Sequence, residues 1–402
     1  MNSVVRQMWE QNTDVVMVDT GNSYEGLCEY VGGKYISYTD EHPITMNPFA
    51  IKREELNIEK IGFLKNLIML IWKGTQGEVT KTEDRLIEQV ITEYFDEYFA
   101  KKQIDNLSFN TFYEYSTVRI PQIIKENNLA GIDLAAYNYL LKDFYEGGSH
   151  ELTLNENLDT KLFDETFIVF EIDSIKDDPL LFPLVTLIIM DVFIQKMRIK
   201  KNRKVLVIEE AWKAIASPMM AEYIKYLYKT ARKFWASVGV VTQEIQDIVG
   251  SPIVKEAIIN NSDIVMLLDQ SKFRERFDEI KAILGLTDVD CKKIFTINRL
   301  ENKEGRSFFR EVFIRRGSVG GVFGVEEPHE CYMTYTTERA EKEALKLYKK
   351  ELQCDHQHAI EAYCRDWELS GITKSLPFAQ EVNQAGHVLR LKPKQEKGLN
   401  RL

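Results

Sequence analysis

The strongest constraint on the fold of this sequence is a series of short apolar runs, each followed by helical periodicity, that begins at Phe167. The runs are rich in Val, Ile and Leu, as is typical of strands buried on both faces of a parallel sheet. The helical stretches between them supply the crossovers that parallel strands need, so the sequence predicts an α/β domain. The predicted strands are Phe167–Ile172, Lys204–Glu209, Ser237–Thr242 and Asp263–Leu268, and the predicted helices include Pro179–Lys200 and Ser217–Trp235.

Another part of this α/β domain opens the chain. The residues Asp14–Asp19 form a β-branched run that ends in turn residues, and Lys34–Tyr38 predicts a second short strand. From about residue 50 to residue 165 the spacing is helical and no convincing strand occurs, which predicts an all-helical insertion. We therefore place the domain boundaries at 1–49 and 166–337 for the α/β domain, 50–165 for the insertion and 338–402 for C-terminal helices and a tail.

The last part of the α/β domain has a different pattern. Alternating segments at Phe309–Ile314 and Cys331–Tyr335 predict antiparallel edge strands, with the glycine-rich segment Gly317–Gly324 between them. The insertion also holds several aromatic residues that fit a buried core or, less commonly, a patch for docking a partner. They are Tyr94, Phe95, Tyr98, Phe112 and Tyr113.

Composition narrows the functional classes. A net charge of -10 argues against a surface that is basic overall, as broad nucleic-acid binding would require, so any DNA contact must be local. The five cysteines form no CxxC pair and fit a reducing cytoplasm, and the first residues lack the pattern of a secretory signal. The most apolar stretch, Pro179–Met197, is interrupted by Asp191, so we interpret it as a buried helix rather than a membrane span.

Two adjacent carboxylates, Glu209 and Glu210, end the predicted strand that begins at Lys204. Open α/β sheets bind ligands at the carboxyl ends of their strands, and nucleotide hydrolases of the P-loop class place acidic residues there. Glu209 would hold magnesium and Glu210 would activate the attacking water. The alternative is that both residues simply favour the start of the following helix.

The next predicted strand ends at Thr242 and is followed by Gln243. A glutamine in this place can contact both a γ-phosphate and the attacking water, although a polar loop residue is the simpler reading. Arg232 and Arg310 are candidates for stabilising charge across a subunit boundary, and their alternative role is on a solvated surface. Asp19, at the end of the first strand, is a candidate nucleotide contact.

Several of these segments together resemble the TraG/VirB-type ATPases of conjugation and type IV secretion, most closely TraG of Bacteroides-type conjugative transposons. They are Asp14–Tyr24, Gly32–Ile36, Ile44–Phe49, Val207–Trp212 and Val241–Gln243. The resemblance implies a RecA-like motor domain, a hexamer, ATP and magnesium as cofactors, and a peripheral place on the cytoplasmic side of the inner membrane. It implies the roles given above for Glu209, Glu210 and Gln243. Its implied partners are secretion-channel components, a coupling ATPase and, as a further candidate, DNA.

One expected motif is missing from the sequence. Family members carry a GxxxxGK[ST] loop before the segment with which this chain opens, and the 402 residues contain no such loop. The segments Gly74–Thr82 and Gly317–Gly324 have glycines but not the required order with lysine. We therefore expect this polypeptide to bind ATP weakly and not to hydrolyse it alone.

Three functions remain open at this point. The first is a motor ATPase whose activity resides in a longer chain. The others are a non-catalytic interaction module of the transfer apparatus and a cytoplasmic DNA translocase, which salt-dependent DNA binding would reveal.

Overall fold

The computed structural model describes residues 1–157, 160–210, 218–242, 258–299 and 309–389. The chain divides into two compact units. One unit contains Met8–Gly21 and Lys34–Asn261, and the other contains Met1–Gln7, Asn22–Gly33 and the chain from Ser262 onward. Helix α1 (Asn2–Glu10) includes the first boundary between them.

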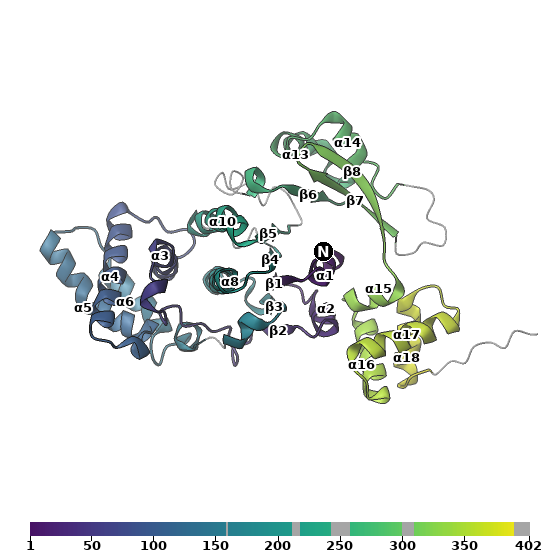
Figure 1. Ribbon diagram of the computed structural model, residues 1–402, viewed down its shortest axis with the longest axis horizontal. Coiled ribbons are helices and arrows are strands. Elements are labelled where there is room, and N and C mark those ends of the chain that lie inside the picture. The colour runs from purple at the N-terminus through teal and green to yellow at the C-terminus, as the bar shows by residue number, and fades with distance from the viewer. Residues whose placement is uncertain (158–159, 211–217, 243–257, 300–308, 390–402) are drawn as a thin grey trace, which may run out of the picture. The chain divides into compact units, whose positions relative to one another are not determined.

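A five-stranded parallel sheet forms the centre of the Met8–Gly21 and Lys34–Asn261 unit, with the strand order β2-β3-β1-β4-β5 (Figure 1). Every residue of β1 and β3 is buried, which explains why their sequences are continuous apolar runs rather than alternating ones. The parallel α/β fold is therefore confirmed. The strands are β1 (Thr13–Asp19), β2 (Lys34–Ser37), β3 (Phe167–Glu171), β4 (Arg203–Ile208) and β5 (Ala236–Val240).

Helix α8 (Leu181–Ile199) packs against β1 and β4, and α10 (Pro218–Ala231) packs against α8 and β5 (Figure 1). Almost every residue of α8 is buried, as expected for the apolar stretch around Asp191. None of the helices in the described ranges, α8 included, combines the length and the apolarity that a bilayer crossing demands. The predicted start of the α10 region at Ser217 lies outside the described residues.

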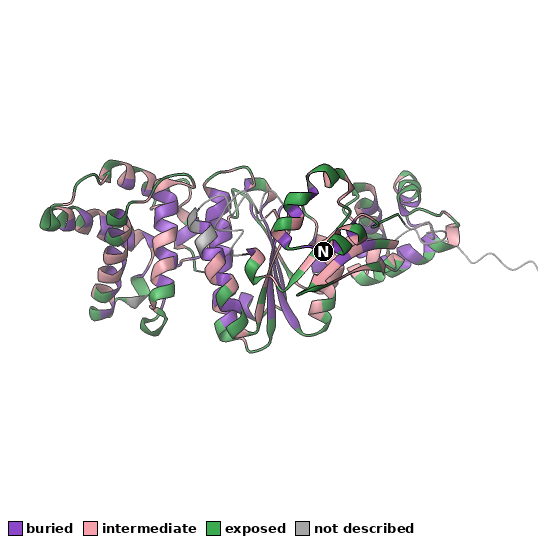
Figure 2. Cartoon of the chain, turned by 90° about the horizontal axis from the view of Figure 1, so that it is seen from above, coloured by how far each residue is buried: buried purple, intermediate pink, exposed green. Residues whose placement is uncertain are grey.

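The chain between β2 and β3 forms helices, and their inward faces share one hydrophobic core with the sheet (Figure 2). Tyr94, Phe95 and Phe112 are fully buried, which confirms the core interpretation for these three aromatic residues. The α-helices are α3 (Ile58–Lys73), α4 (Lys81–Ala100), α5 (Phe109–Asn127), α6 (Leu134–Leu141) and α7 (Glu151–Asn155), with short 3₁₀ turns at Arg53–Glu55, Ile104–Asn106, Lys142–Phe144 and Thr160–Asp164.

A buried ion pair joins the insertion to the core. The ammonium of Lys60 on α3 lies 2.8 Å from the carboxylate of Asp191 on α8, which also accepts a hydrogen bond from Gln195. Both charged side chains are almost inaccessible to solvent. Because an unpaired charge at this depth would be costly, the pair favours one position of α3 along α8.

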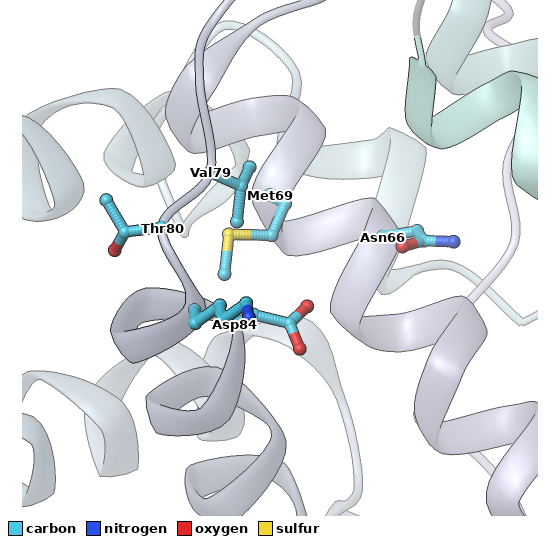
Figure 3. Close-up of a pocket in the computed structure, with 6 residues that line it drawn as sticks. Asn66, Met69, Val79, Thr80 and Asp84 are labelled. Carbon is cyan, nitrogen blue, oxygen red and sulfur yellow. The ribbon is translucent and has the colours of Figure 1, made fainter.

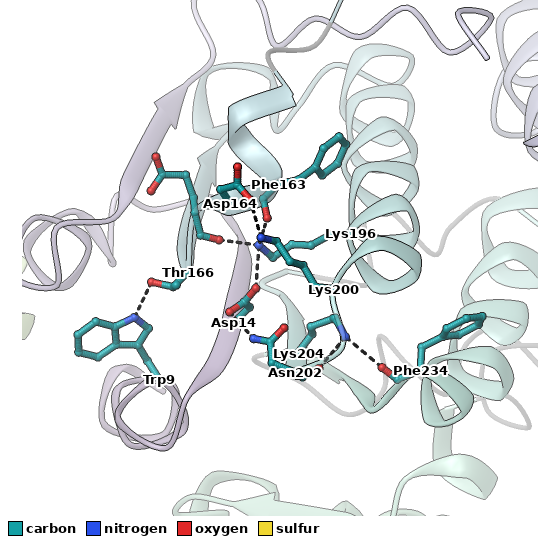
Figure 4. Close-up of polar contacts among 11 residues, drawn as sticks. Trp9, Asp14, Phe163, Asp164, Thr166, Lys196, Lys200, Asn202, Lys204 and Phe234 are labelled. Atoms are coloured by element: carbon teal, nitrogen blue, oxygen red, sulfur yellow. Dashed lines mark hydrogen bonds and ion pairs between the residues drawn. The ribbon is translucent and has the colours of Figure 1, made fainter. Parts of the chain in front are cut away.

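A second buried polar network lies at the amino ends of the strands (Figure 4). Lys196 at the end of α8 is fully buried and contacts Asp14 of β1 at 2.9 Å and the carbonyl oxygen of Phe163 at 2.9 Å. Lys204, at the start of β4, is also buried and donates to the carbonyl oxygens of Asn202 and Phe234. Burial lowers the pKa of Lys204. The network holds the segment that leaves the insertion against the sheet.

The other unit contains an antiparallel sheet of β6 (Ile264–Leu267), β7 (Phe309–Arg316) and β8 (Val319–Glu326). The prediction that Asp263–Leu268 continues the parallel sheet was wrong, because β6 pairs antiparallel with β7. Ile264 and Met266 are exposed, so the short apolar run did not identify a strand buried on both faces. Helices α13 (Phe277–Leu284) and α14 (Asp288–Ile294) belong to the same unit.

Two details of the region after residue 308 also differ from the prediction. Most of the glycine-rich segment lies in strand β8. A side chain at Gly320 or Gly324 would collide with the rings of Phe313 and Phe309, which favours glycine at these two positions. The predicted strand Cys331–Tyr335 lies instead in helix α15 (His329–Tyr335). Pro328 precedes this helix, and Met333 packs into the hydrophobic cluster of the C-terminal helices.

The C-terminal helices are α15, α16 (Arg339–Leu352), α17 (His356–Ser370) and α18 (Ser375–Ala385), and α2 (Glu25–Tyr30) packs against α15 and α17. The backbone of α2 approaches α15 closely, since a Cβ atom on Gly26 would lie 2.4 Å from the carbonyl oxygen of Thr334. Polar contacts reinforce this packing: Lys342 and Lys349 form ion pairs with Glu25 and Glu29, and the Nδ1 atom of His356 lies 3.3 Å from the Glu29 carboxylate.

Candidate functional site

Acidic residues collect at the carboxyl ends of three neighbouring strands in the parallel sheet. Asp19 ends β1 and is paired in register with Glu171, which ends β3. On the other side, the backbone nitrogen of Glu209 donates to the carbonyl oxygen of Val18 at 3.0 Å, which places Glu209 beside Asp19. Adjacent strands are about 4.8 Å apart, so the three acids form a row across this edge.

Asp19 and Glu171 are both buried and bonded to nearby groups. Asp19 accepts a hydrogen bond from the backbone nitrogen of Gly21, at the turn that follows β1. Glu171 accepts from the hydroxyl of Tyr35 at 3.2 Å and from the backbone nitrogen of Asp173 at 2.8 Å. These bonds hold the two carboxylates in fixed directions. Analysis of the sequence missed Glu171, although an acid at the end of a third buried strand was a usable signal.

Glu210 has an unusual backbone conformation, with φ of 49° immediately after the strand that carries Glu209. A residue with a Cβ atom is strained in this left-handed region, and such strain is concentrated at functional sites. The chain therefore turns sharply between the two glutamates. Both are partly exposed, so both can contact a ligand.

The remaining predicted site residues have different positions. Gln243 lies outside the described residues, although Thr242, directly before it, follows β5 at the same carboxyl edge. Arg232 lies in a 3₁₀ turn just before β5, on the side of the amino ends, so the structure does not bring it together with Glu209 in the same chain. Arg310 lies on β7 of the other compact unit and is exposed.

The donor set fits magnesium together with a phosphate. Mg²⁺ usually takes one or two carboxylates and completes its shell with phosphate oxygens and water. In the described part of the chain, no three acidic, histidine or cysteine side chains lie close enough to enclose a metal ion themselves. Glu209 and Asp19 are the residues that would face the ion.

The segment Gly74–Thr82 provides no phosphate site. Gly74 ends helix α3 and Thr80 caps α4, so the segment connects two helices instead of leading from a strand into a helix. A pocket of about 270 Å³ beside it is lined by Asp84 as well as by Lys81 (Figure 3). The Asp84 carboxylate pairs with Lys65 and would repel a phosphate.

The family is identified by comparison with known proteins. The model of the TraG P-loop domain matches residues 1–367. The chain belongs to the TraG P-loop domain family. This is the family of conjugative transfer and type IV secretion ATPases.

Individual relatives are distant. Protein TraC of Escherichia coli K12 is 22% identical over 297 residues, which are 69% of this chain and 31% of TraC, so this chain spans about a third of the length of that relative. The structure of VirB4 from Thermoanaerobacter pseudethanolicus is similar with a TM-score of 0.59 and 19% identity, over 81% of this chain and 85% of VirB4. The unbound conjugative coupling protein TrwB has a TM-score of 0.51 and 11% identity, over 81% of each chain. These likenesses confirm the RecA-like fold.

Proposed function

We propose that this TraG-family chain is the hydrolysis side of a motor ATPase that powers DNA or protein transfer through the envelope. Glu209, with Asp19, orients magnesium, and Glu210 activates the attacking water. Gln243 senses the γ-phosphate. The observation that carries this proposal is the row of acids at the carboxyl edge with Glu210 directly after it in a left-handed conformation.

The acids alone are a poor phosphate-binding surface. Carboxylates repel the phosphates of ATP unless magnesium and a cradle of backbone N–H groups offset that repulsion, and the 402 residues contain no GxxxxGK[ST] loop. We therefore expect isothermal titration of this polypeptide with ATP and magnesium to show no micromolar binding. A micromolar dissociation constant would mean that a phosphate-binding site lies within these residues.

The catalytic assignment is tested in a longer polypeptide in which a strand and a GxxxxGK[ST] loop precede residue 1. We expect this protein to hydrolyse ATP and Glu210→Gln to lower the turnover rate by about 10²- to 10⁴-fold, the usual contribution of a general base. The exposed Glu54→Gln is the control and should keep the full rate. Unchanged hydrolysis in Glu210→Gln would refute the assigned role.

We propose the partners, the location and the assembly of this protein from its family. The partners are channel components at the inner membrane and a coupling ATPase, and the location is the cytoplasmic face of that membrane. The active assembly is a homohexamer, in which Arg232 or Arg310 of one subunit stabilises the transition state of hydrolysis in the neighbouring subunit. The coupling protein TrwB, which has a similar fold, has been solved in complex with a non-hydrolysable GTP analogue, and this supports nucleotide use by this chain. Mass measurement of the loop-containing protein with nucleotide tests the hexamer.

A non-catalytic interaction module is the second candidate. The distribution of charge favours it, because residues 50–165 hold 21 acidic and 13 basic residues, so the insertion carries a net charge of -8 out of the chain's -10. If the loop-containing protein has no ATPase activity while the isolated chain still binds a component of the apparatus, this second function replaces the first.

A further inference from the structure

A polar groove with a volume of about 950 Å³ opens in the helical insertion. It is lined by three segments that include helix connections, here called connecting segments. They are the chain before α3 at residues 47–52, the end of α4 through the start of α5 at residues 98–111, and the last residue of α7 with the two that follow it at residues 155–157. The volume falls in the range of typical ligand clefts. No residue assigned to nucleotide hydrolysis lines it.

The walls of the groove are held in place by hydrogen bonds. Asn47 donates to the carbonyl oxygen of Leu107 at 2.8 Å and accepts from the backbone nitrogen of Phe49 at 3.0 Å. Asn155 accepts from the backbone nitrogen of Asn110 at 2.9 Å and donates to the carbonyl oxygen of Phe144 at 2.9 Å. Each asparagine therefore ties two of the connecting segments together or fixes one to the helices.

Buried aromatic rings support the groove from the interior. The centroid of the Phe49 ring lies 4.9 Å from that of the Phe112 ring and 6.2 Å from that of the Phe109 ring. All three side chains are fully buried. Packed rings of this kind leave little freedom to the backbone above them. The groove is therefore preformed, which lowers the entropic cost of binding.

Four amide groups in the groove are available to a ligand. The side chains of Gln103, Asn106 and Asn157 are exposed and make no hydrogen bond with any described residue. The side-chain oxygen of Asn110 accepts from the backbone nitrogen of Glu146, but its amide nitrogen makes no bond to the described chain. Each amide offers donors and an acceptor that match the N–H and C=O groups of a peptide backbone.

The charges in and around the groove select against other ligands. Lys52 and Asp105 both line it, so its own charge is balanced. A nucleic acid would bring many phosphates to an insertion whose net charge is -8, and repulsion disfavours that. The three apolar lining residues, Ala50, Ile51 and Leu107, are too few for a hydrophobic ligand.

We propose that this groove binds an extended, neutral to basic polypeptide segment of a partner protein, and that the amide groups of Gln103 and Asn106 and the amide nitrogen of Asn110 bond to its backbone. The groove is separate from the proposed ATPase site, so it can bind such a segment whether or not the chain hydrolyses ATP.

The test uses a phage-displayed library of random 12-residue peptides, selected on the 402-residue protein. Enriched peptides are synthesised and their affinities are measured by fluorescence anisotropy. The double variant Gln103→Ala/Asn106→Ala should weaken binding by about tenfold, because two hydrogen bonds are lost. Gln122→Ala is the matched control, since it removes an exposed amide on α5 of the same insertion, outside the groove.

Folding is checked independently, because the double variant must keep the circular dichroism spectrum and the unfolding midpoint of the parent. Hydrogen exchange should slow at residues 98–111 when an enriched peptide is added. The proposal is overturned if no peptide is enriched, if the double variant binds the enriched peptides as tightly as the parent, or if the protected amides lie outside the three connecting segments.

Discussion

The ammonium group of Lys196 lies 2.9 Å from the carboxylate of Asp14, and this ion pair is buried at the amino ends of the sheet strands (Figure 4). Lys196 also bonds to the carbonyl oxygens of Phe163 and Glu165, which precede β3. One side chain thus connects helix α8, strand β1 and the segment that leaves the insertion.

Replacing Lys196 with methionine leaves Asp14 as a buried carboxylate without its cation. We expect Lys196→Met to lower the free energy of unfolding by roughly 3–5 kcal/mol, which urea denaturation would measure. The control is Lys200→Met on the same helix end, because Lys200 pairs with the exposed Asp164 and its loss should change stability little. Equal effects of the two variants would contradict the special role of Lys196.

Gly26 should not tolerate a side chain. In Gly26→Ala the new Cβ atom would lie 2.4 Å from the carbonyl oxygen of Thr334, so α2 must shift away from α15 at a cost of roughly 1–3 kcal/mol. Gly62→Ala is the matched control on helix α3, where nothing lies within 4 Å, and it should stabilise the protein by about 0.5–1 kcal/mol. Thermal unfolding should show a lower midpoint for Gly26→Ala and a higher midpoint for Gly62→Ala than for the parent protein.

The two histidines at the start of α17 should respond to pH with opposite signs. Burial lowers the pKa of His356, so the unfolded chain takes up the proton first and stability falls as the pH drops below the ordinary histidine pKa of about 6.5. The hydrogen bond to Asp355 raises the pKa of His358, whose contribution is present at low pH and is lost as the pH rises through that raised value.

Unfolding midpoints measured from pH 8 to pH 5 test this difference. His356→Gln should reduce the loss of stability on acidification, whereas His358→Gln should not. The charged groups nearest His356 include Glu29 and Lys349, and both variants keep these two residues. An unchanged acid response in His356→Gln would show that other groups cause it.

Replacing Glu210 with glycine should stabilise the protein. The φ of 49° at this residue disfavours side chains, so we expect Glu210→Gly to raise the free energy of unfolding by roughly 1–2 kcal/mol. Asn12→Gly is the comparison, because its φ of 61° is similar but asparagine tolerates this region well. If Glu210→Gly stabilises the isolated chain and also removes ATPase activity from the loop-containing protein, the side chain at this position is kept for function at a cost in stability.

The sequence predicted best the strands of the parallel sheet that are buried on both faces. The strands β1, β3 and β4 are buried along nearly their whole length, and their apolar runs indicated this directly. Strand β6 was misassigned because four apolar residues in a row fit a parallel or an antiparallel strand equally well. Helix α15 was missed because seven residues give too few turns for a clear helical period.

The candidate site was predicted only in part. Glu209 and Asp19 could be placed at one edge because the carboxyl ends of parallel strands meet there. The pairing of Asp19 with Glu171 depends on strand order, which joins residues far apart in the sequence, and no local pattern contains that information. The left-handed turn at Glu210 also had no signal, since glutamate rarely adopts it.

The position of the insertion affects how the chain can fold during synthesis. Strand β1 lies between β3 and β4, so both its neighbours are made only after the ribosome has completed the helical insertion. Until then β1 exposes two unpaired edges, while the helices can already form from local contacts. Nascent chains halted before residue 167 should therefore be helical and prone to aggregate or to recruit chaperones, and release from this state should coincide with the emergence of β3 and β4 from the ribosome.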